Sequence, residues 1–230
     1  MNADSRQPLS PGSASWSALQ FAGLDLVAPL AVGLGSSSRY AMVLGNSRAL
    51  WPRFLAWLAA DRARLELDHP LNDYVASKVN SALAIAQAAE GFKTLAIDFD
   101  HTEPVVDLVG AAVAAGLLWR APTGLGIHPV FGPWVALRAR VVFDAPPPND
   151  GQPAPPCRAC DTRCRPALSR LKALSSEAEL RQRAAEFIAL RVACPLGSEH
   201  RYDDDQTQYH YTKDRRLLRS TVERMRIQTP

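Results

Sequence analysis

The sequence lacks the features that mark exported and nucleic-acid-binding proteins. Among its 230 residues are four cysteines, and 26 basic residues stand against 23 acidic ones, for a net charge of +3. This excess is too small to provide the basic surface that nucleic-acid binding requires, so no nucleic-acid partner is expected. The N-terminal residues are polar, without a basic segment followed by an apolar run, and they predict no secretory signal.

Long apolar runs are also absent. The longest, VVDLVGAAVAAGLLW, is interrupted by Asp107 and is shorter than a membrane span, so no membrane partner is expected. Together these absences predict a cytoplasmic protein. In that compartment cysteines are reduced thiols or metal ligands rather than structural disulfides.

Three common cofactor and catalytic motifs are missing as well. The sequence contains neither G-x-G-x-x-G after its first predicted strand nor G-x-x-x-x-G-K-[ST], which argues against a Rossmann-type dinucleotide site and a P-loop. The segment GSSS lacks the G-x-S-x-G pattern of a nucleophile elbow. No residue is assigned a catalytic role from these patterns.

The hydrophobic pattern predicts an α+β fold. Short apolar runs at 24–33, 39–46 and 93–100 are typical of strands, and in 134–143 Leu137, Ala139 and Val141 alternate with arginines. Helical spacing begins at Arg48, with apolar positions on one face from Leu50 to Leu65, and again at Pro70, with Gly91 as the expected end cap. A mostly apolar helix is expected over 103–119. We therefore expect a mixed sheet flanked by helices.

The composition divides the chain into four predicted regions. These are a disordered N-terminus at 1–15, an α+β core at 16–145, a proline-rich connector at 146–156 and a Cys-rich helical region at 157–230 packed on the core. Within the last region, Asp203 and its neighbours predict the start of one amphipathic helix, with Arg215, Arg216 and Arg219 near its end.

The segment GIHPVFGPW, residues 126–134, combines stiffness with flat apolar area. Its prolines hold a loop rigid, its glycines allow close approach to a ligand, and Phe131 and Trp134 offer ring surfaces. His128 is the polar tip. One interpretation is an ordinary loop with a hydrogen-bonded histidine; the other is the rim of a pocket for a large, mostly apolar ligand.

This segment resembles a stretch of the CblC family of cobalamin-processing proteins, also called the MMACHC type. GIHPVFGPWVALRARVVF is similar to the family's IHPRFGGWFAIRGVV, and YAMVLGNSRALWPRFLAWL, DHPLNDYVASKV and PLGSEHRYDDDQTQYHY are similar to other family segments in the same order. The resemblance implies a nitroreductase-like α+β fold with a small Cys-containing helical C-terminal extension. It also implies a corrin pocket lined by Gly126, His128, Pro129, Phe131, Gly132 and Trp134.

The resemblance further implies an activity. Family members bind cobalamin (vitamin B12) with its base off the cobalt and remove the upper axial ligand, as a cyanocobalamin reductase or an alkylcobalamin dealkylase. Cyanide leaves by reduction, and alkyl groups leave by transfer to the thiolate of glutathione. Val130 replaces a family arginine and Pro133 a family glycine. Because family glutathione contacts come from C-terminal arginines, the candidates here are Arg191, Arg215 and Arg216.

The four cysteines form a second candidate site. Cys157, Cys160 and Cys164 follow a C-x2-C-x3-C pattern, and Cys194 precedes a proline. This run resembles the ferredoxin-type motif of epoxyqueuosine reductases and reductive dehalogenases. Thiolates at such spacing suit a 4Fe–4S cluster, a zinc ion, or no metal at all.

Three functions therefore stay open at this point. The first is an oxidoreductase that strips the upper ligand from cobalamin, with a thiol or another reductant as co-substrate. The second is a corrinoid carrier or chaperone without chemistry, and the third is a ferredoxin-like electron-transfer protein. The sequence leaves the reductant open, and also whether the chain is a monomer or a homodimer.

Overall fold

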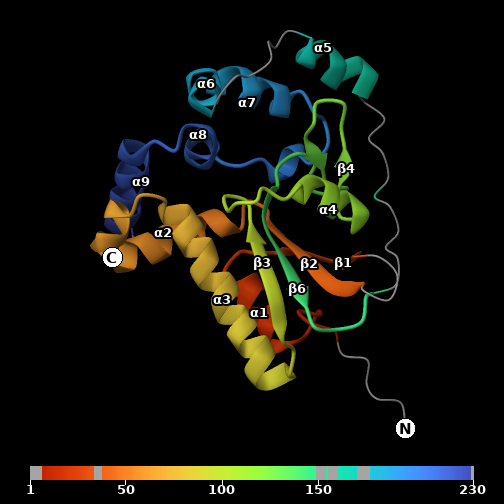
Figure 1. Cartoon of the computed structure of the whole chain (residues 1–230). Coiled ribbons are helices and arrows are strands. Elements are labelled where there is room, and N and C mark those ends of the chain that lie inside the picture. Colours follow the sequence, from red (N-terminus) through yellow and green to blue (C-terminus); the bar gives the residue numbers. More distant parts are fainter. Residues whose placement is uncertain (1–6, 34–37, 149–153, 155–159, 170–176, 229–230) are drawn as a thin grey trace.

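The structure is a computed structural model that describes residues 7–33, 38–148, 154, 160–169 and 177–228 (Figure 1). In the first part of the chain the elements are α1 Ala14–Phe21, β1 Leu26–Val32, β2 Arg39–Asn46, α2 Leu50–Ala60, η2 Arg62–Glu66, α3 Pro70–Glu90, β3 Thr94–Phe99, α4 Leu108–Ala114, β4 Trp119–Arg120, β5 Gly126–Ile127 and β6 Ala136–Phe143. In the second part they are η3 Cys160–Cys164, α5 Arg165–Leu168, α6 Glu177–Gln182, α7 Ala184–Val192, η4 Ser198–His200, α8 Asp204–Thr212 and α9 Arg215–Gln228.

A four-stranded sheet in the order β1-β2-β6-β3 forms the centre of the fold. Its strands pair antiparallel along every described ladder, so the sheet is antiparallel rather than mixed. Along β2 the side chains alternate, because Tyr40, Met42 and Leu44 face one core cluster and Ala41 and Val43 face the other. The predicted α+β class with flanking helices is confirmed.

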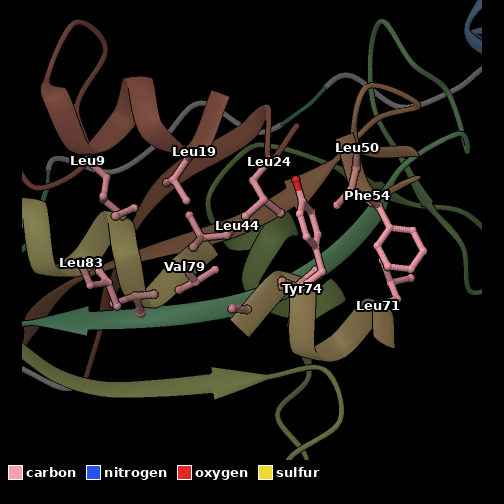
Figure 2. Close-up of a cluster of buried hydrophobic side chains, with 14 of the residues drawn as sticks. Leu9, Leu19, Leu24, Leu44, Leu50, Phe54, Leu71, Tyr74, Val79 and Leu83 are labelled. Atoms are coloured by element: carbon pink, nitrogen blue, oxygen red, sulfur yellow. The ribbon is translucent and has the colours of Figure 1, made fainter. Parts of the chain in front are cut away.

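One face of the sheet carries the larger core, which α1, α2 and α3 cover (Figure 2). Helix α3 begins with Pro70 in its first turn and ends at Gly91, whose φ of 79° provides the left-handed cap that the sequence predicted. Helix α2 ends at Ala60, earlier than the apolar spacing predicts, because the Asp61 side chain accepts from Ala63 and starts the separate 3-10 turn η2.

Helix α4 covers the other face through a smaller cluster built around Leu26, Ala41, Val43 and Ala112. The expected helix over 103–119 is shorter in the structure. Asp107 sets its start, since this carboxylate accepts the backbone N–H of Gly110 at 2.8 Å and caps the helix. The segment before Asp107 is therefore free to line a cavity instead of forming a helix.

A β-bulge interrupts β6 where it pairs with β2. Leu44 pairs with Ala139 but Gly45 pairs with Leu137, so Arg138 is the extra residue on β6. Because of this extra residue, the β6 side chains that precede the bulge point to the opposite face of the sheet from the one that strict alternation predicts. Leu137 joins the α4 side of the sheet instead of the side occupied by Ala139 and Val141, which corrects the simple alternation expected from the sequence.

Residues 7–15, which belong to the N-terminal region expected to be disordered, contact the core in the structure. Leu9 is fully buried in the main core. Ser13 caps α1, and Ser15 binds the Glu90 carboxylate through its backbone N–H at 2.9 Å and its hydroxyl at 2.7 Å. These contacts tie the segment to the end of α3. Residues 1–6 lie outside the described ranges.

The C-terminal residues form two helices, not the single amphipathic helix expected. Lys213 adopts φ 53° and separates α8 from α9. Asp203 caps the start of α8 as predicted, by accepting the N–H of Gln206 at 2.6 Å. Arg215 and Arg216 consequently lie at the start of α9 rather than near a C-terminus. None of the helices in the described part of the chain is long and apolar enough to cross a membrane.

Candidate functional site

A cavity of about 780 Å³ opens beside α4 and the bulged end of β6. The segment before α4, the β4–β5 hairpin, the first residues of β6, and the two helices α7 and α8 all contribute to it. Most of its wall is apolar. Its lining residues are Asp100, Val105, Val106, Asp107, Leu108, Val109, Leu118, Gly124, Leu125, Gly126, Pro133, Val135, Ala136, Leu137, Arg138, Arg191, His210 and Lys213.

Arg138 is held at the cavity by the bulge. It is 7% exposed, its Nε donates to the Asn46 side-chain oxygen at 2.7 Å, and its Nη1 lies 3.5 Å from Asp100 Oδ2. Without the bulge, strict alternation would place residue 138 on one face together with residues 136 and 140. The extra residue instead brings a partly neutralised guanidinium into the cavity wall.

Arg191 of α7 is the most unusual group in this wall. It is only 5% exposed, and its guanidinium carbon lies 5.5 Å from each of the ring centroids of Trp134, Tyr202 and Tyr211. Its Nε and Nη1 have no hydrogen-bond partner among the described residues. A buried cation held by rings, with two donors unused within the described residues, is a candidate binding group.

His210 and Tyr202 extend this polar corner. Burial, followed by the positive charge of Arg191, lowers the pKa of His210 well below its ordinary value, so the imidazole is neutral at pH 7. Burial raises the pKa of Tyr202, whose hydroxyl also lacks a hydrogen-bond partner within the described ranges. The ring centroids of Tyr202 and His210 are 6.0 Å apart. A neutral imidazole at the wall can donate or accept a hydrogen bond.

His128 braces the loop that follows β5. Its Nδ1 accepts the backbone N–H groups of Val130 and Phe131 at 3.1 and 3.2 Å. Because both partners are donors, Nδ1 carries no proton and the ring is the neutral Nε2–H tautomer. Burial lowers the pKa of His128, in agreement with that state. The backbone groups of His128 and Gly132 also pair with each other, at 2.8 and 2.9 Å.

Two glycines let this loop contact the turn after α7. A Cβ added to Gly132 would lie 1.9 Å from the Leu196 carbonyl oxygen, and one added to Gly197 would lie 2.2 Å from the Phe131 carbonyl carbon. Both glycines have positive φ, 56° and 66°. The His-Pro segment and the C-terminal Cys-Pro segment therefore pack backbone to backbone.

The six predicted pocket residues lie on β5 and the loop that follows it, but they differ in their relation to the cavity. Gly126 lines it. Trp134 is 1% exposed and reaches the cavity only through its contact with Arg191. His128, Pro129, Phe131 and Gly132 are outside the lining, where Phe131 packs against His128 and His200 at 4.8 Å between ring centroids. The direct ligand role of these residues stays a prediction.

The structure brings two of the four cysteines together. Cys164 and Cys194 are 3% and 4% exposed and belong to one small buried cluster with Ala121 and Ile127. Cys157 lies outside the described residues, and so does the side chain of Cys160. Among the residues that are described, no group of three or more His, Cys, Asp or Glu side chains could hold a metal ion.

Comparisons with known proteins give one informative result. No family model matches the sequence, and no curated protein matches it. Among solved structures, the chain is similar to the C. elegans B12-trafficking protein CblC, described as a human MMACHC homologue. The TM-score is 0.62 and the sequence identity is 15%, over 91% of this chain and 88% of that chain. This chain has the CblC fold.

The CblC fold confirms the predicted nitroreductase-like architecture. The likeness covers the sheet and also most of the helical C-terminal part, since it spans 91% of the chain. At 15% identity the likeness shows the fold, and any chemistry has to be inferred from the residues of the cavity. The predicted ferredoxin-like relationship of the cysteine run has no counterpart in this comparison.

Sequence reasoning missed most of the polar groups of the cavity. Arg138 was placed by alternation alone, Arg191 was noted only through the resemblance, and Asp100 and His210 were not singled out. One signal was available for Arg191, because it interrupts the apolar run FIALRVAC at a position where a helix would bury it. The bulge at Arg138 leaves no comparable trace in the sequence.

Proposed function

We propose that this chain binds a cobalamin-type corrinoid, base-off, in the cavity beside α4 and β6, and that it promotes removal of the upper axial ligand. The observation that carries the proposal is the cavity itself. In a CblC fold, it combines an apolar wall with three convergent buried or half-buried polar side chains, Arg138, Arg191 and His210. A large, flat, amide-fringed macrocycle matches this combination of a broad apolar face and a few polar anchors.

Different residues of the cavity would contact different parts of the corrinoid. Valines and leucines from the α4 side would contact the faces of the macrocycle, while Arg138 and His210 would hydrogen-bond its peripheral amides. The cobalt, once bound, would supply the redox and alkyl-transfer chemistry. The apolar wall would exclude water from the reacting face, and the loop braced by His128 would hold Pro133 and Trp134 in place.

Arg191 is suited to the co-substrate. Its two unused donors and its ring cage favour an anion, such as a carboxylate of glutathione or of another thiol reductant. Val130, which replaces the family arginine, is 54% exposed and outside the cavity lining. The absence of the family arginine at position 130 therefore does not remove a cation from this cavity. A thiol co-substrate remains compatible with the site.

Titration with cyanocobalamin tests the proposal. A red-to-yellow absorbance change without reductant is expected on base-off binding, and a further change only after addition of a thiol or an electron donor. The double variant Arg138→Met/His210→Leu should weaken binding at least tenfold, while Arg62→Gln, on the exposed surface, should not change it. Base-off binding without any further absorbance change after addition of the reductant would favour a corrinoid carrier. The absence of any absorbance change would refute both the enzyme and the carrier hypotheses.

A metal centre at the cysteines is a second candidate, favoured by the convergence of Cys164 and Cys194. Leu125, which lines the proposed corrinoid cavity, packs against their shared cluster, so a centre there would adjoin the cavity. We propose that Cys157 and Cys160 complete a 4Fe–4S site that delivers electrons to the bound corrinoid. Zinc is the alternative occupant.

Anaerobic reconstitution followed by iron, sulfide and zinc analysis tests the metal centre. About four irons and four sulfides per chain are expected, with loss of the cluster in Cys194→Ser and retained corrinoid binding. One zinc ion per chain would show that the site holds zinc and no 4Fe–4S cluster. A protein without bound metal would refute both the cluster and the zinc site. The predicted cytoplasmic location and the choice between monomer and homodimer stay predictions.

A further inference from the structure

A second cavity, of about 670 Å³, lies at the start of α2 where α8 and α9 meet it. It shares no lining residue with the first cavity. Its wall is more charged, and three arginines contribute to it. The lining residues are Arg48, Ala49, Trp51, Pro52, Leu55, Arg201, Asp203, Asp205, Gln206, Thr221, Arg224 and Met225.

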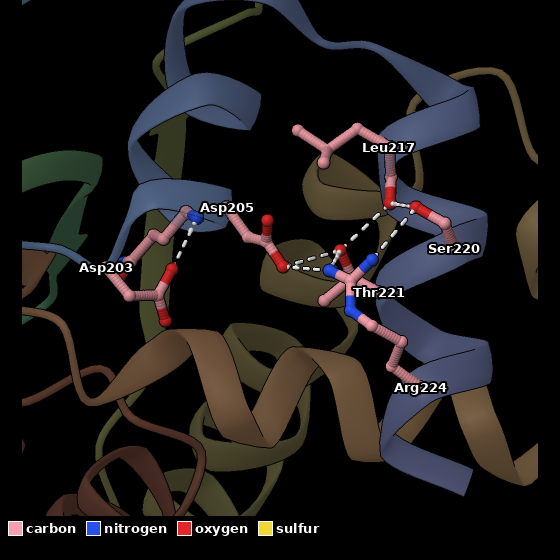
Figure 3. Close-up of polar contacts among 7 residues, drawn as sticks. Asp203, Asp205, Leu217, Ser220, Thr221 and Arg224 are labelled. Atoms are coloured by element: carbon pink, nitrogen blue, oxygen red, sulfur yellow. Dashed lines mark hydrogen bonds and ion pairs between the residues drawn. The ribbon is translucent and has the colours of Figure 1, made fainter. Parts of the chain in front are cut away.

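The carboxylates of this cavity are already engaged by the fold. Asp203 accepts the N–H of Gln206 at 2.6 Å and caps α8. Asp205 Oδ2 accepts from Thr221 at 2.9 Å and forms an ion pair with Arg224, as Figure 3 shows between α8 and α9. The ion pair with Arg224 compensates Asp205, whereas Asp203 keeps its negative charge, so the charged side chains of the lining leave a net positive charge of one.

The other two arginines lack such compensation. Arg48 Nη1 donates to the Glu199 carbonyl at 3.0 Å, and the Arg201 guanidinium lies 5.4 Å from the centroid of the Trp134 ring. Neither forms an ion pair with a carboxylate in the described part of the chain. The eleven-residue helix α2 begins directly after Arg48 at the same cavity, and its N-cap, Ala49, provides no side-chain hydrogen bond. Its positive dipole end therefore adds to the two guanidinium charges.

Gln206 provides an independent sign of a missing ligand. The residue is 6% exposed, yet it lines the cavity. Its backbone N–H binds Asp203, whereas its side-chain amide binds none of the described residues. The amide is not sealed away from the cavity, and there it is expected to bind water or a ligand. It can donate to an anion that the two arginines attract.

We propose that this second cavity binds a phosphate ester, held by Arg48 and Arg201, the start of α2 and the Gln206 amide. Guanidinium groups match the oxygens of a phosphate with paired hydrogen bonds, and a helix start favours the same charge. The ester can belong to a free phosphorylated molecule of nucleotide size. It can also be the phosphodiester in the nucleotide tail of a base-off corrinoid, and this second source rests on the proposed function.

Trp134 lies between one arginine of each cavity. The centroid of its ring is 5.5 Å from the guanidinium carbon of Arg191, in the first cavity, and 5.4 Å from that of Arg201, in the second. The ring is 1% exposed and lines neither cavity. A corrinoid with its macrocycle in the first cavity and its phosphate in the second would place the displaced tail near this ring.

Calorimetric titration of the full chain distinguishes the sources. The probes are AMP, inorganic phosphate, cobalamin and cobinamide, a corrinoid without the nucleotide tail. Wild type is compared with Arg48→Gln/Arg201→Gln, with Gln206→Leu and with Arg62→Gln as the matched surface control. If the tail is the ligand, cobalamin binds about tenfold or more tightly than cobinamide, and the double variant removes this preference without weakening cobinamide.

If a free phosphate ester is the ligand, AMP binds wild type and Arg62→Gln but loses about tenfold or more in the double variant and in Gln206→Leu. AMP binding without any corrinoid binding would keep this inference and overturn the proposed function. Equal affinity for the two corrinoids together with no AMP or phosphate binding would overturn the inference while the proposed function stands. Circular dichroism of each variant checks that the fold is retained.

Discussion

Replacement of Arg191 by methionine tests whether the buried guanidinium serves the fold or a ligand. The side chain is 5% exposed, is enclosed by three aromatic rings, and leaves Nε and Nη1 without partners among the described residues. Methionine has similar length and can fill the space between the rings without a charge. The change therefore removes the cation while it keeps most of the packing.

The expected effect on stability follows from two opposing sums. Each unsatisfied buried N–H costs about 1–3 kcal/mol, so the two cost about 2–6 kcal/mol before the wider desolvation of the cation is counted. The three contacts between the guanidinium and the aromatic rings stabilise the folded state by about 0.5–2 kcal/mol each. The sums nearly cancel, and Arg191→Met should leave the free energy of unfolding of the unliganded protein unchanged or raise it by up to about 2 kcal/mol.

Arg191→Met should weaken the binding of an anionic co-substrate. Hydrogen bonds from a charged donor contribute about 1.5–3 kcal/mol, which corresponds to a loss of about 10- to 100-fold in affinity for an anionic co-substrate. Urea unfolding of the unliganded protein and calorimetric titration with glutathione, in the presence of the corrinoid, measure the two quantities. Arg183→Met is the control near the start of the same helix, because Arg183 pairs with Glu179 and Glu186.

The opposite pattern would refute this reasoning. If Arg191→Met lowered the free energy of unfolding by more than about 3 kcal/mol and left the affinity for every ligand unchanged, Arg191 would be a structural residue whose partners compensate it in the fold. The cavity would then lose its most distinctive binding group.

Three further predictions concern the loop and the histidines. Gly132→Ala should destabilise the fold by about 3 kcal/mol in urea unfolding and weaken corrinoid binding, because its Cβ would overlap the Leu196 carbonyl at a φ of 56°. His128→Ala should cost about 1–3 kcal/mol through two lost loop hydrogen bonds, and His128→Asn, which offers one oxygen, should cost less. The folded pKa of His210 is depressed, so below pH 6.5 the unfolded chain binds the extra proton. This group alone should lower stability by at most about 1.4 kcal/mol per pH unit, and His210→Gln should remove its share of the slope but leave the share of His128, whose pKa is also lowered.

The elements of the fold could be predicted wherever one local rule decided them. Apolar runs located β1, β2 and β3, and proline and glycine located both ends of α3. Predictions failed where a side chain outside the hydrophobic pattern set the boundary. Asp61 and Asp107 start new elements by accepting backbone N–H groups, and Lys213 divides the C-terminal helix with a left-handed backbone that its residue type does not announce.

The candidate site was harder to predict because its parts come from distant segments. The sequence favoured GIHPVFGPW, and the structure shows why that segment is so stiff: it supports the cavity wall and contacts the turn at Gly197. The binding groups themselves arise from a bulge in β6 and from α7 and α8. Only long-range packing determines that Arg138, Arg191 and His210 face one space, and periodicity within a segment carries no such information.

His128 illustrates how a conspicuous residue can support a site without forming its ligand contact. Its Nδ1 is committed to two backbone N–H groups, which leaves only the Nε2–H donor for any other role. Arg191 and the Tyr202 hydroxyl are buried polar groups with donors or acceptors that the described fold does not use. Since burial of an unpaired polar group costs free energy, a fold that retains two such residues is expected to recover that free energy on binding. The groups to mutate first are therefore those that the fold leaves unsatisfied, rather than those that the sequence makes most conspicuous.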